Sequence, residues 1–152
     1  MASELGKCDL VTFVNIVDVE RARAFYRDTL GLRQTGDEQP YALVFDANGI
    51  MLRLVLNKEK PAFPGTVLGW RVPDVSAAVQ RLTKAGVQFE HYGFPTQDEA
   101  GVWTTPTGAK VAWFKDPDGN VLSVSQHLGD ETSREVDDYL SRQTICNRSL
   151  QL

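Results

Sequence analysis

Apolar and polar residues alternate in two stretches of the chain that resemble each other. The first runs Val11-Thr-Phe-Val-Asn-Ile, and the second runs Val67-Leu-Gly-Trp-Arg-Val. Each is followed by an aspartate, and Asp18 and Asp74 lie 56 positions apart, as Val11 and Val67 do. Alternation with a period of two is typical of a half-buried strand, and a short carboxylate suits the N-cap of a helix. We therefore predict a strand followed by a helix in each half.

Both predicted helices have one apolar face and end at a glycine. The face of the first consists of Val19, Ala22, Phe25, Tyr26 and Leu30, and that of the second consists of Val75, Ala78, Val79 and Leu82. Gly31 and Gly86 follow, and glycine tolerates the left-handed conformation that closes a helix.

A glycine-containing turn marks the last hairpin of each half. Asn48-Gly49 and Asp118-Gly119 lie 70 positions apart, and such pairs favour tight hairpins. Strand-like residues precede them at 41–46 and 110–115, and alternating residues follow. Each half thus reads as strand, helix and three-stranded meander. The larger spacing means that the second half carries about 14 extra residues, which we place between Glu90 and Gly108.

These elements predict an α+β fold of two βαβββ modules that pair their sheets around a concave pocket. We place one domain at 9–126, with module one at about 9–57 and module two at about 66–126. Residues 127–152 are expected to form a C-terminal helix, over Asp130–Arg142, and a polar tail. A concave sheet face with several inward side chains is a natural site for a small ligand.

The composition is that of an ordinary globular protein and excludes several classes. Hydrophobic residues make up 42% and charged residues 24%. A net charge of −4, with scattered basic residues, predicts no nucleic-acid partner. The densest group of basic residues along the chain is Arg21, Arg23 and Arg27. Their helical spacing indicates a solvated helix face. The chain has no apolar run of about 18 residues and no basic-then-apolar start, which predicts a cytoplasmic protein with no membrane partner.

Two segments resemble a known family. The segment 25–32, Phe-Tyr-Arg-Asp-Thr-Leu-Gly-Leu, closely resembles the end of the first helix in glyoxalase/bleomycin-resistance (vicinal oxygen chelate) proteins. The segment 114–120, Phe-Lys-Asp-Pro-Asp-Gly-Asn, resembles the turn before their last strand. With the repeat, the resemblance covers about residues 9–126. It implies the paired-module fold, a small-molecule ligand and a homodimer, sometimes with exchanged halves.

The resemblance also identifies where catalytic family members hold a divalent metal. In those members, His, Glu or Gln occupies four symmetric strand positions, and the matching residues here are Val11, Arg53, Val67 and Ser123. Valine cannot bind a metal, arginine is only a donor, and serine alone is a poor ligand. We therefore expect no metal and no cofactor, and metal-dependent glyoxalase or dioxygenase activity is not expected.

Strand alternation, with the family's ligand positions marking the concave side, predicts the residues that line the pocket. They are Phe13, Asn15, Met51, Arg53, Arg71, Ser123 and Ser125, and Trp103 of the inserted loop is added to this set. Arg53 interrupts an apolar strand and has two interpretations. It either pairs with a local carboxylate or reaches the cavity mouth, or it anchors an anionic or carbonyl-bearing ligand through its guanidinium fork.

Aromatic residues are a second source of ligand contacts. Those considered are Tyr41, Tyr92, Phe94, Trp103 and Trp113, which serve either as core and barrel wall or as stacking surfaces. Trp103 lies in the inserted loop, which has no packing pattern of its own, and long loops are often functional. In the family this segment often borders the pocket, so the resemblance implies that Trp103 caps a ligand.

Three functions follow from these features. The first is a metal-independent small-molecule binding protein for an anionic or aromatic ligand. The second is a family enzyme, a lyase, isomerase or dioxygenase, with a relocated or absent metal site near Glu90, His91, Asp98 and Glu99. The third is a partner-binding module that uses the C-terminal helix.

Overall fold

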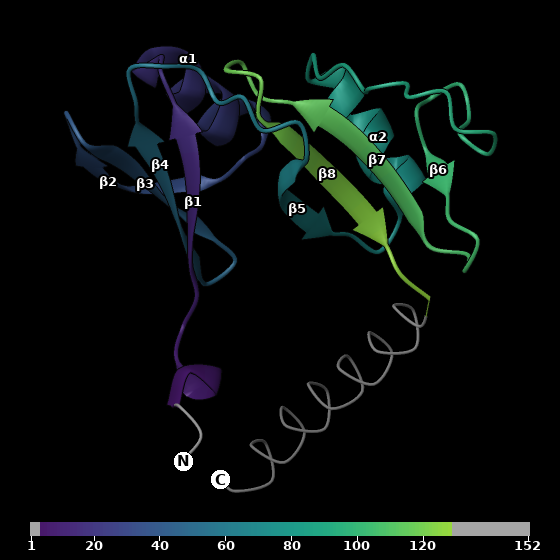
Figure 1. The fold of residues 1–152 in the computed structure, drawn as a ribbon, viewed down its shortest axis with the longest axis horizontal. Coiled ribbons are helices and arrows are strands. Elements are labelled where there is room, and N and C mark those ends of the chain that lie inside the picture. Colours follow the sequence, from purple (N-terminus) through teal and green to yellow (C-terminus); the bar gives the residue numbers. More distant parts are fainter. Residues whose placement is uncertain (1–3, 129–152) are drawn as a thin grey trace, which may run out of the picture.

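Two four-stranded sheets with the same strand order form the body of the protein (Figure 1). The structure is a computed structural model and describes residues 4–128. Sheet A has the order β1-β4-β3-β2, and sheet B has the order β5-β8-β7-β6. In each sheet the first strand runs parallel to the last strand of its module, and the other pairs are antiparallel. The α+β fold and the duplicated βαβββ pattern are thus confirmed.

Module one follows a short 3₁₀ turn, η1 (Glu4–Lys7). Its elements are β1 (Val11–Ile16), α1 (Val19–Arg23), η2 (Ala24–Thr29), β2 (Arg33–Glu38), β3 (Ala42–Ala47) and β4 (Ile50–Leu56). The single helix expected here changes geometry half-way, because η2 is a π-helical segment in which the Leu30 N–H donates to the Phe25 carbonyl at 2.9 Å. Gly31, at φ 75°, follows its end as predicted.

Module two repeats this order with an insertion. Its elements are β5 (Thr66–Arg71), α2 (Val75–Lys84), β6 (Trp103–Thr104), β7 (Lys110–Lys115) and β8 (Val121–Gln126). The two-residue strand β6 lies within the extra segment between Glu90 and Gly108. Val67 lies where the register of β5 against β8 shifts, so it has no direct partner in the ladder.

Aspartate caps begin both helices as the sequence indicates. The Arg21 N–H donates to Asp18 Oδ1, and the Ala77 N–H donates to Asp74 Oδ1, each at 3.0 Å. These bonds satisfy N–H groups that have no partner within the first helical turn.

Strand alternation separates a packed face from an open face in each sheet. On β1 and β4, Val14, Ile16, Leu52 and Leu54 are buried, whereas Val11, Phe13 and Met51 are exposed. The packed faces of both sheets join helix residues in one core, in which Phe25 of η2 contacts Phe114 of β7 with ring centroids 6.4 Å apart. The two modules therefore share a hydrophobic core on their helix sides, and no helix within residues 4–128 covers the other face of each sheet, here called its open face.

Some predictions cannot be placed on this fold. The expected helix over Asp130–Arg142, the polar tail and Cys146 lie outside the described residues. In the part of the chain that the structure describes, no helix is long and apolar enough to cross a membrane.

Candidate functional site

The predicted pocket residues fall into two groups, one on each sheet. Phe13, Asn15, Met51 and Arg53 belong to β1 and β4 of sheet A, and Arg71, Trp103, Ser123 and Ser125 belong to sheet B. Their strand positions place them on the faces opposite the buried core residues. Within sheet A, Phe13 and Arg53 are directly paired neighbours.

The guanidinium of Arg53 is paired on the open face of sheet A. It donates two hydrogen bonds to the carboxylate of Glu38, at the end of β2. These bonds lower the pKa of Glu38, and they raise that of Arg53. Of the two environments predicted for Arg53, the structure shows pairing with a local carboxylate. An anionic ligand at this position would have to compete with Glu38.

Four aromatic side chains gather at one end of sheet B. Trp113 of β7 stacks on Trp103 of β6, with centroids 5.9 Å apart and an interplanar angle of 28°. Phe94 contacts both indoles, at 5.0 Å from Trp103 and 5.9 Å from Trp113. Tyr92 meets Trp113 edge-on at 5.5 Å. We call Tyr92, Phe94, Trp103 and Trp113 the aromatic patch; Tyr92 and Phe94 are exposed, and both indoles are partly exposed.

The aromatic patch and the predicted serines lie in the same cross-strand rows. Gly69, Ser123 and Trp113 form one row across β5, β8 and β7. Arg71, Ser125, Val111 and Trp103 form the next row and end on β6. Directly opposed residues point to the same face of a sheet. The aromatic patch therefore continues the open face that carries Ser123 and Ser125.

Only one member of the aromatic patch was among the predicted pocket residues. Trp113 could have been found by extending the alternation into β7, where Ala112 and Phe114 are fully buried and Trp113 must face the other way. The structure adds the position of Phe94 and Tyr92, which approach the indoles from the irregular chain before β6. Burial raises the pKa of Tyr92, and the Glu90 carboxylate adds to the rise.

A close approach of backbone and side chain lies beside the aromatic patch. Ser123 is only 8% exposed, and a Cβ built on Gly69 would lie 2.6 Å from its Oγ. Glycine at position 69 therefore leaves the space that the Ser123 hydroxyl occupies. Ser125 is the other serine in the predicted set. Its Oγ lies 3.1 Å from Nε2 of His127.

The four positions that the resemblance matches to the family's metal ligands carry side chains that are poor metal ligands. Val11 and Val67 offer hydrocarbon, Arg53 is a paired cation, and Ser123 is a single hydroxyl. In residues 4–128 no group of three or more His, Cys, Asp and Glu side chains is arranged to hold a metal ion.

The loop residues considered for an alternative metal or acid–base site take part in local hydrogen bonds. Asp98 accepts from the N–H groups of Ala100 and Val102, at 3.0 and 2.9 Å. The His91 ring lies 2.9 Å from the Glu99 carbonyl oxygen. The Gln97 amide donates to two carbonyls of the loop, those of Glu90 and Gly101, at 2.9 Å each. These bonds give the inserted segment a defined shape.

The modules are joined by a buried polar network at the turn after β7. Tyr26 donates its hydroxyl to Asp116 Oδ2 at 2.8 Å, and the Asn120 amide donates to the same oxygen at 2.8 Å and to the Asn15 carbonyl at 2.8 Å. Oδ1 of Asp116 accepts from the N–H groups of Asp118 and Asn120. Burial and the Asp116 carboxylate raise the pKa of Tyr26, so its hydroxyl stays protonated as a donor.

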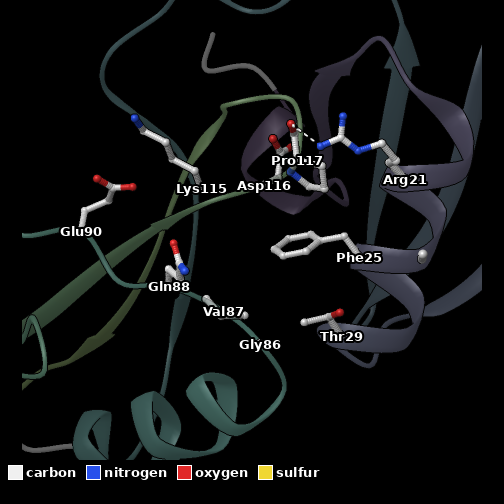
Figure 2. A pocket seen from close by; sticks show the side chains of 11 residues that line it. Arg21, Phe25, Thr29, Gly86, Val87, Gln88, Glu90, Lys115, Asp116 and Pro117 are labelled. Atoms are coloured by element: carbon white, nitrogen blue, oxygen red, sulfur yellow. Dashed lines mark hydrogen bonds between the residues drawn. The ribbon is translucent and has the colours of Figure 1, made fainter.

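A groove lies along this junction, between η2 and the segment that follows α2 (Figure 2). It has a volume of about 620 Å³, and the ring of Phe25 points into it. Its lining contains charges of both signs, with Arg21 and Lys115 as cations and Glu90 and the buried Asp116 as carboxylates. The groove therefore shows no preference for one charge.

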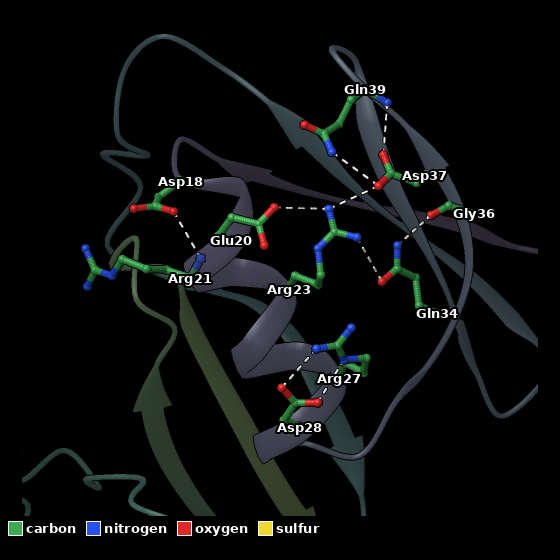
Figure 3. A network of polar contacts seen from close by, with 10 residues as sticks. All are labelled: Asp18, Glu20, Arg21, Arg23, Arg27, Asp28, Gln34, Gly36, Asp37 and Gln39. Carbon is green, nitrogen blue, oxygen red and sulfur yellow. Dashed lines mark hydrogen bonds and ion pairs between the residues drawn. The ribbon is translucent and has the colours of Figure 1, made fainter.

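Two of the three arginines in the basic cluster of the first helix, Arg23 and Arg27, pair with neighbouring acids (Figure 3). Arg23 contacts Glu20 at 3.3 Å and Asp37 at 3.0 Å, and Arg27 contacts Asp28 at 2.8 Å. Hydrogen bonds from Gln39 and Arg23 lower the pKa of Asp37. Arg21 and Arg27 are exposed, as expected for a solvated helix face, whereas the Arg23 side chain is only 17% exposed and is held between Glu20 and Asp37.

Comparison with known proteins gives the family. The family model described as "Glyoxalase/Bleomycin resistance protein/Dioxygenase superfamily" matches residues 9–124. The chain belongs to this superfamily. Its resemblance segments now have a structural explanation, because Phe25 and Tyr26 of the first contact Phe114 and Asp116 of the second. No curated protein matches the chain.

Solved structures of the superfamily have the same fold. A lactoylglutathione lyase from Agrobacterium tumefaciens is 22% identical, with a TM-score of 0.62, covering 78% of this chain and 92% of its own. A superfamily member from Sphaerobacter thermophilus DSM 20745 is 26% identical, with a TM-score of 0.59 and coverage of 80% and 99%. A glyoxalase-related enzyme from Fulvimarina pelagi is 20% identical, with a TM-score of 0.58 and coverage of 80% and 88%.

Proposed function

We propose that this superfamily member is a cytoplasmic, metal-independent binding protein for a flat aromatic small molecule, and that it works as a homodimer. The observation that carries the proposal is the aromatic patch on the open face of sheet B. Stacked and edge-on rings with solvent-exposed surface form a platform that a planar ligand can extend.

The choice of an aromatic rather than a purely anionic ligand follows from the two open faces. On sheet A, the positive charge of Arg53 is balanced by Glu38, so a ligand anion gains little there. On sheet B, the aromatic patch offers ring surfaces, and Arg71, in the same strand row as Trp103, lies three strands away with β8 and β7 between them. A planar aromatic ring would therefore suit sheet B, with its face on the aromatic patch.

Metal-free binding is supported by the side chains at the family's ligand positions. A divalent ion held in protein needs several oxygen, nitrogen or sulfur ligands. The two valines and Arg53 supply no metal ligand, and Ser123 supplies one weak one. Without a metal, the protein has no Lewis acid to polarise a substrate oxygen. The open face of the sheet can still bind a ligand of matching shape.

The open face of sheet A supports the homodimer. Val11, Phe13 and Met51 lie side by side there, and each is exposed. Soluble proteins seldom leave such neighbouring apolar side chains in water, since their burial stabilises an interface by about 25 cal/mol per Å². In the proposed dimer, this face of one copy covers the open face of sheet B in the other and encloses the aromatic patch.

A thermal-shift titration with naphthalene-2-carboxylate tests the ligand proposal. At a ligand concentration of about 100 Kd, binding to the folded state adds about 2.7 kcal/mol, which corresponds to about 5–10 °C in a domain of this size. Trp103→Ala should weaken binding by about fivefold, since ring stacking contributes about 1 kcal/mol. Phe63→Ala is the matched control, because Phe63 is an exposed aromatic in the segment between the modules, and it should bind like the wild type.

Results of two kinds would contradict the proposal. The first kind comes from the titration: no shift with naphthalene-2-carboxylate, or an equal loss in the Trp103 and Phe63 variants. The other is a stoichiometric divalent metal found by elemental analysis of protein purified without added metal, which would favour a superfamily enzyme with a relocated site.

A further inference from the structure

A second groove lies between the modules, where α2 and the end of β5 face the start of β2. We call it the Arg81 groove. It has a volume of about 490 Å³ and is lined by Thr29, Leu30, Leu32, Asn48, Trp70, Arg71, Val72, Ala78, Arg81, Leu82, Phe114 and Val124. A volume of this size lies in the range of sites for small molecules, roughly 300–1,000 Å³.

The floor of the Arg81 groove is part of the hydrophobic core. Phe114 and Val124 are buried, and Trp70 stacks on Phe114 with centroids 6.5 Å apart and an interplanar angle of 18°. Leu30 and Leu82 are only partly buried and pack against the same core. A hydrocarbon chain or ring placed in the groove would cover apolar surface that now faces water.

Among residues 4–128, the charged residues that line the Arg81 groove are Arg81 and Arg71, and no carboxylate lines it. Arg81 is exposed in the last turn of α2. Arg71 ends β5, where strand alternation directs its side chain to the open face of sheet B, so Arg81 supplies the charge on the helix side. This lining differs from that of the groove of Figure 2, where Glu90 and Asp116 offset Arg21 and Lys115. An apolar floor with the Arg81 guanidinium at its rim is complementary to a molecule with an apolar body and one anionic end.

We propose that the Arg81 groove binds a small amphipathic carboxylate, with its apolar part on Trp70, Leu30 and Leu82 and its carboxylate beside the Arg81 guanidinium. The planar fork of arginine matches the two oxygens of a carboxylate. The site is separate from the aromatic patch, because it lies on the helix side of the sheets. It therefore goes beyond the proposed function and does not depend on it.

The probe for this site is octanoate, with octanol as its uncharged counterpart and butanoate as its short counterpart. Isothermal titration calorimetry should show one octanoate per chain. Octanoate should bind roughly tenfold tighter than butanoate, because each buried methylene adds to the hydrophobic gain. Octanol should bind more weakly than octanoate.

Two variants each remove one positive charge from α2, one inside the Arg81 groove and one outside it. Arg81→Gln should weaken octanoate binding about tenfold, as expected for the loss of a charge-assisted hydrogen bond, and Arg81→Lys should keep part of the affinity. Lys84→Gln is the matched control, since Lys84 is exposed one turn further along α2 and does not line this groove. It should bind octanoate like the wild type, and so should Trp103→Ala.

The proposal is overturned if octanoate gives no saturable heat, if octanol binds equally well, or if the Arg81 and Lys84 variants lose affinity equally. A loss in Trp103→Ala alone would move the octanoate site to the aromatic patch and also overturn it. Failure of naphthalene-2-carboxylate to bind would concern only the proposed function.

Discussion

A single hydroxyl, that of Tyr26, links the first helix to the turn after β7. Tyr26 is fully buried, and it is one of four donors to the Asp116 carboxylate, together with the Asn120 amide and two backbone N–H groups. Buried charged groups depend on such donors, because the cost of leaving one unpaired exceeds the gain from making the bond. At the residue scale, this hydrogen bond links η2 of module one to the turn after β7 in module two.

Tyr26→Phe tests the contribution of this hydroxyl. The substitution keeps the ring and its core packing and removes one donor to Asp116, so the free energy of unfolding should fall by about 1–3 kcal/mol. Urea denaturation followed by circular dichroism measures it. Tyr41→Phe is the control, because Tyr41 is 74% exposed, and it should change stability by less than about 0.5 kcal/mol. If both substitutions lower the free energy of unfolding equally, the hydrogen bond from Tyr26 to Asp116 does not contribute to stability as we predict.

At the scale of elements, the hairpin between β3 and β4 depends on backbone conformation. Asn48 and Gly49 have φ values of 52° and 89°, which is the left-handed region that a tight two-residue turn requires. Gly49→Ala leaves the surrounding space open, since nothing lies within 4 Å of the added Cβ. Any loss of stability therefore reports backbone strain alone, and we expect about 1–2 kcal/mol in the free energy of unfolding.

The matching control for the hairpin is Gly6→Ala. Gly6 lies in η1, has equally open surroundings and is not in the left-handed region. Chemical denaturation should show no loss in this variant, and a gain of a few tenths of a kcal/mol would fit the lower entropy of the unfolded chain. If Gly49→Ala proves as stable as Gly6→Ala, the hairpin does not need glycine at this position.

At the scale of the whole molecule, the helix sides of the modules share a core, while no helix in the described part of the chain covers the open faces of the sheets. The proposed homodimer covers those faces, so a charge placed there should separate the subunits. Phe13→Asp should shift sedimentation velocity from twice 16.9 kDa to 16.9 kDa at micromolar concentration.

Phe63→Asp is the control for the dimer, because Phe63 and Phe13 are almost equally exposed, at 63% and 61%, and only Phe13 lies on a sheet. This variant should remain dimeric. A wild-type protein that sediments as a monomer, or an equal effect of both substitutions, would contradict the dimer that we propose.

Much of this architecture is readable in the sequence because it depends on contacts only a few residues apart. The caps at Asp18 and Asp74, the turn at Asn48-Gly49 and the alternation in β1 and β4 each follow from such local chemistry. The repeat of these signals is enough to give two βαβββ modules. The π-helical geometry of η2 was missed, because the apolar spacing of this segment is compatible with an ordinary helix.

The candidate sites depend instead on residues that only folding brings together. Glu38 reaches Arg53 because β2, β3 and β4 pair as a meander, and no pattern around Arg53 identifies this partner among the nearby acids. The aromatic patch forms because the inserted chain returns along β7, so that Phe94 meets Trp103 and Trp113. The Arg81 groove likewise combines Leu30 of one module with Trp70 and Arg81 of the other. Which residues become neighbours at these sites depends on how the two modules pack. That packing is driven by the apolar surface that the whole core buries, and no short stretch of the chain contains this information.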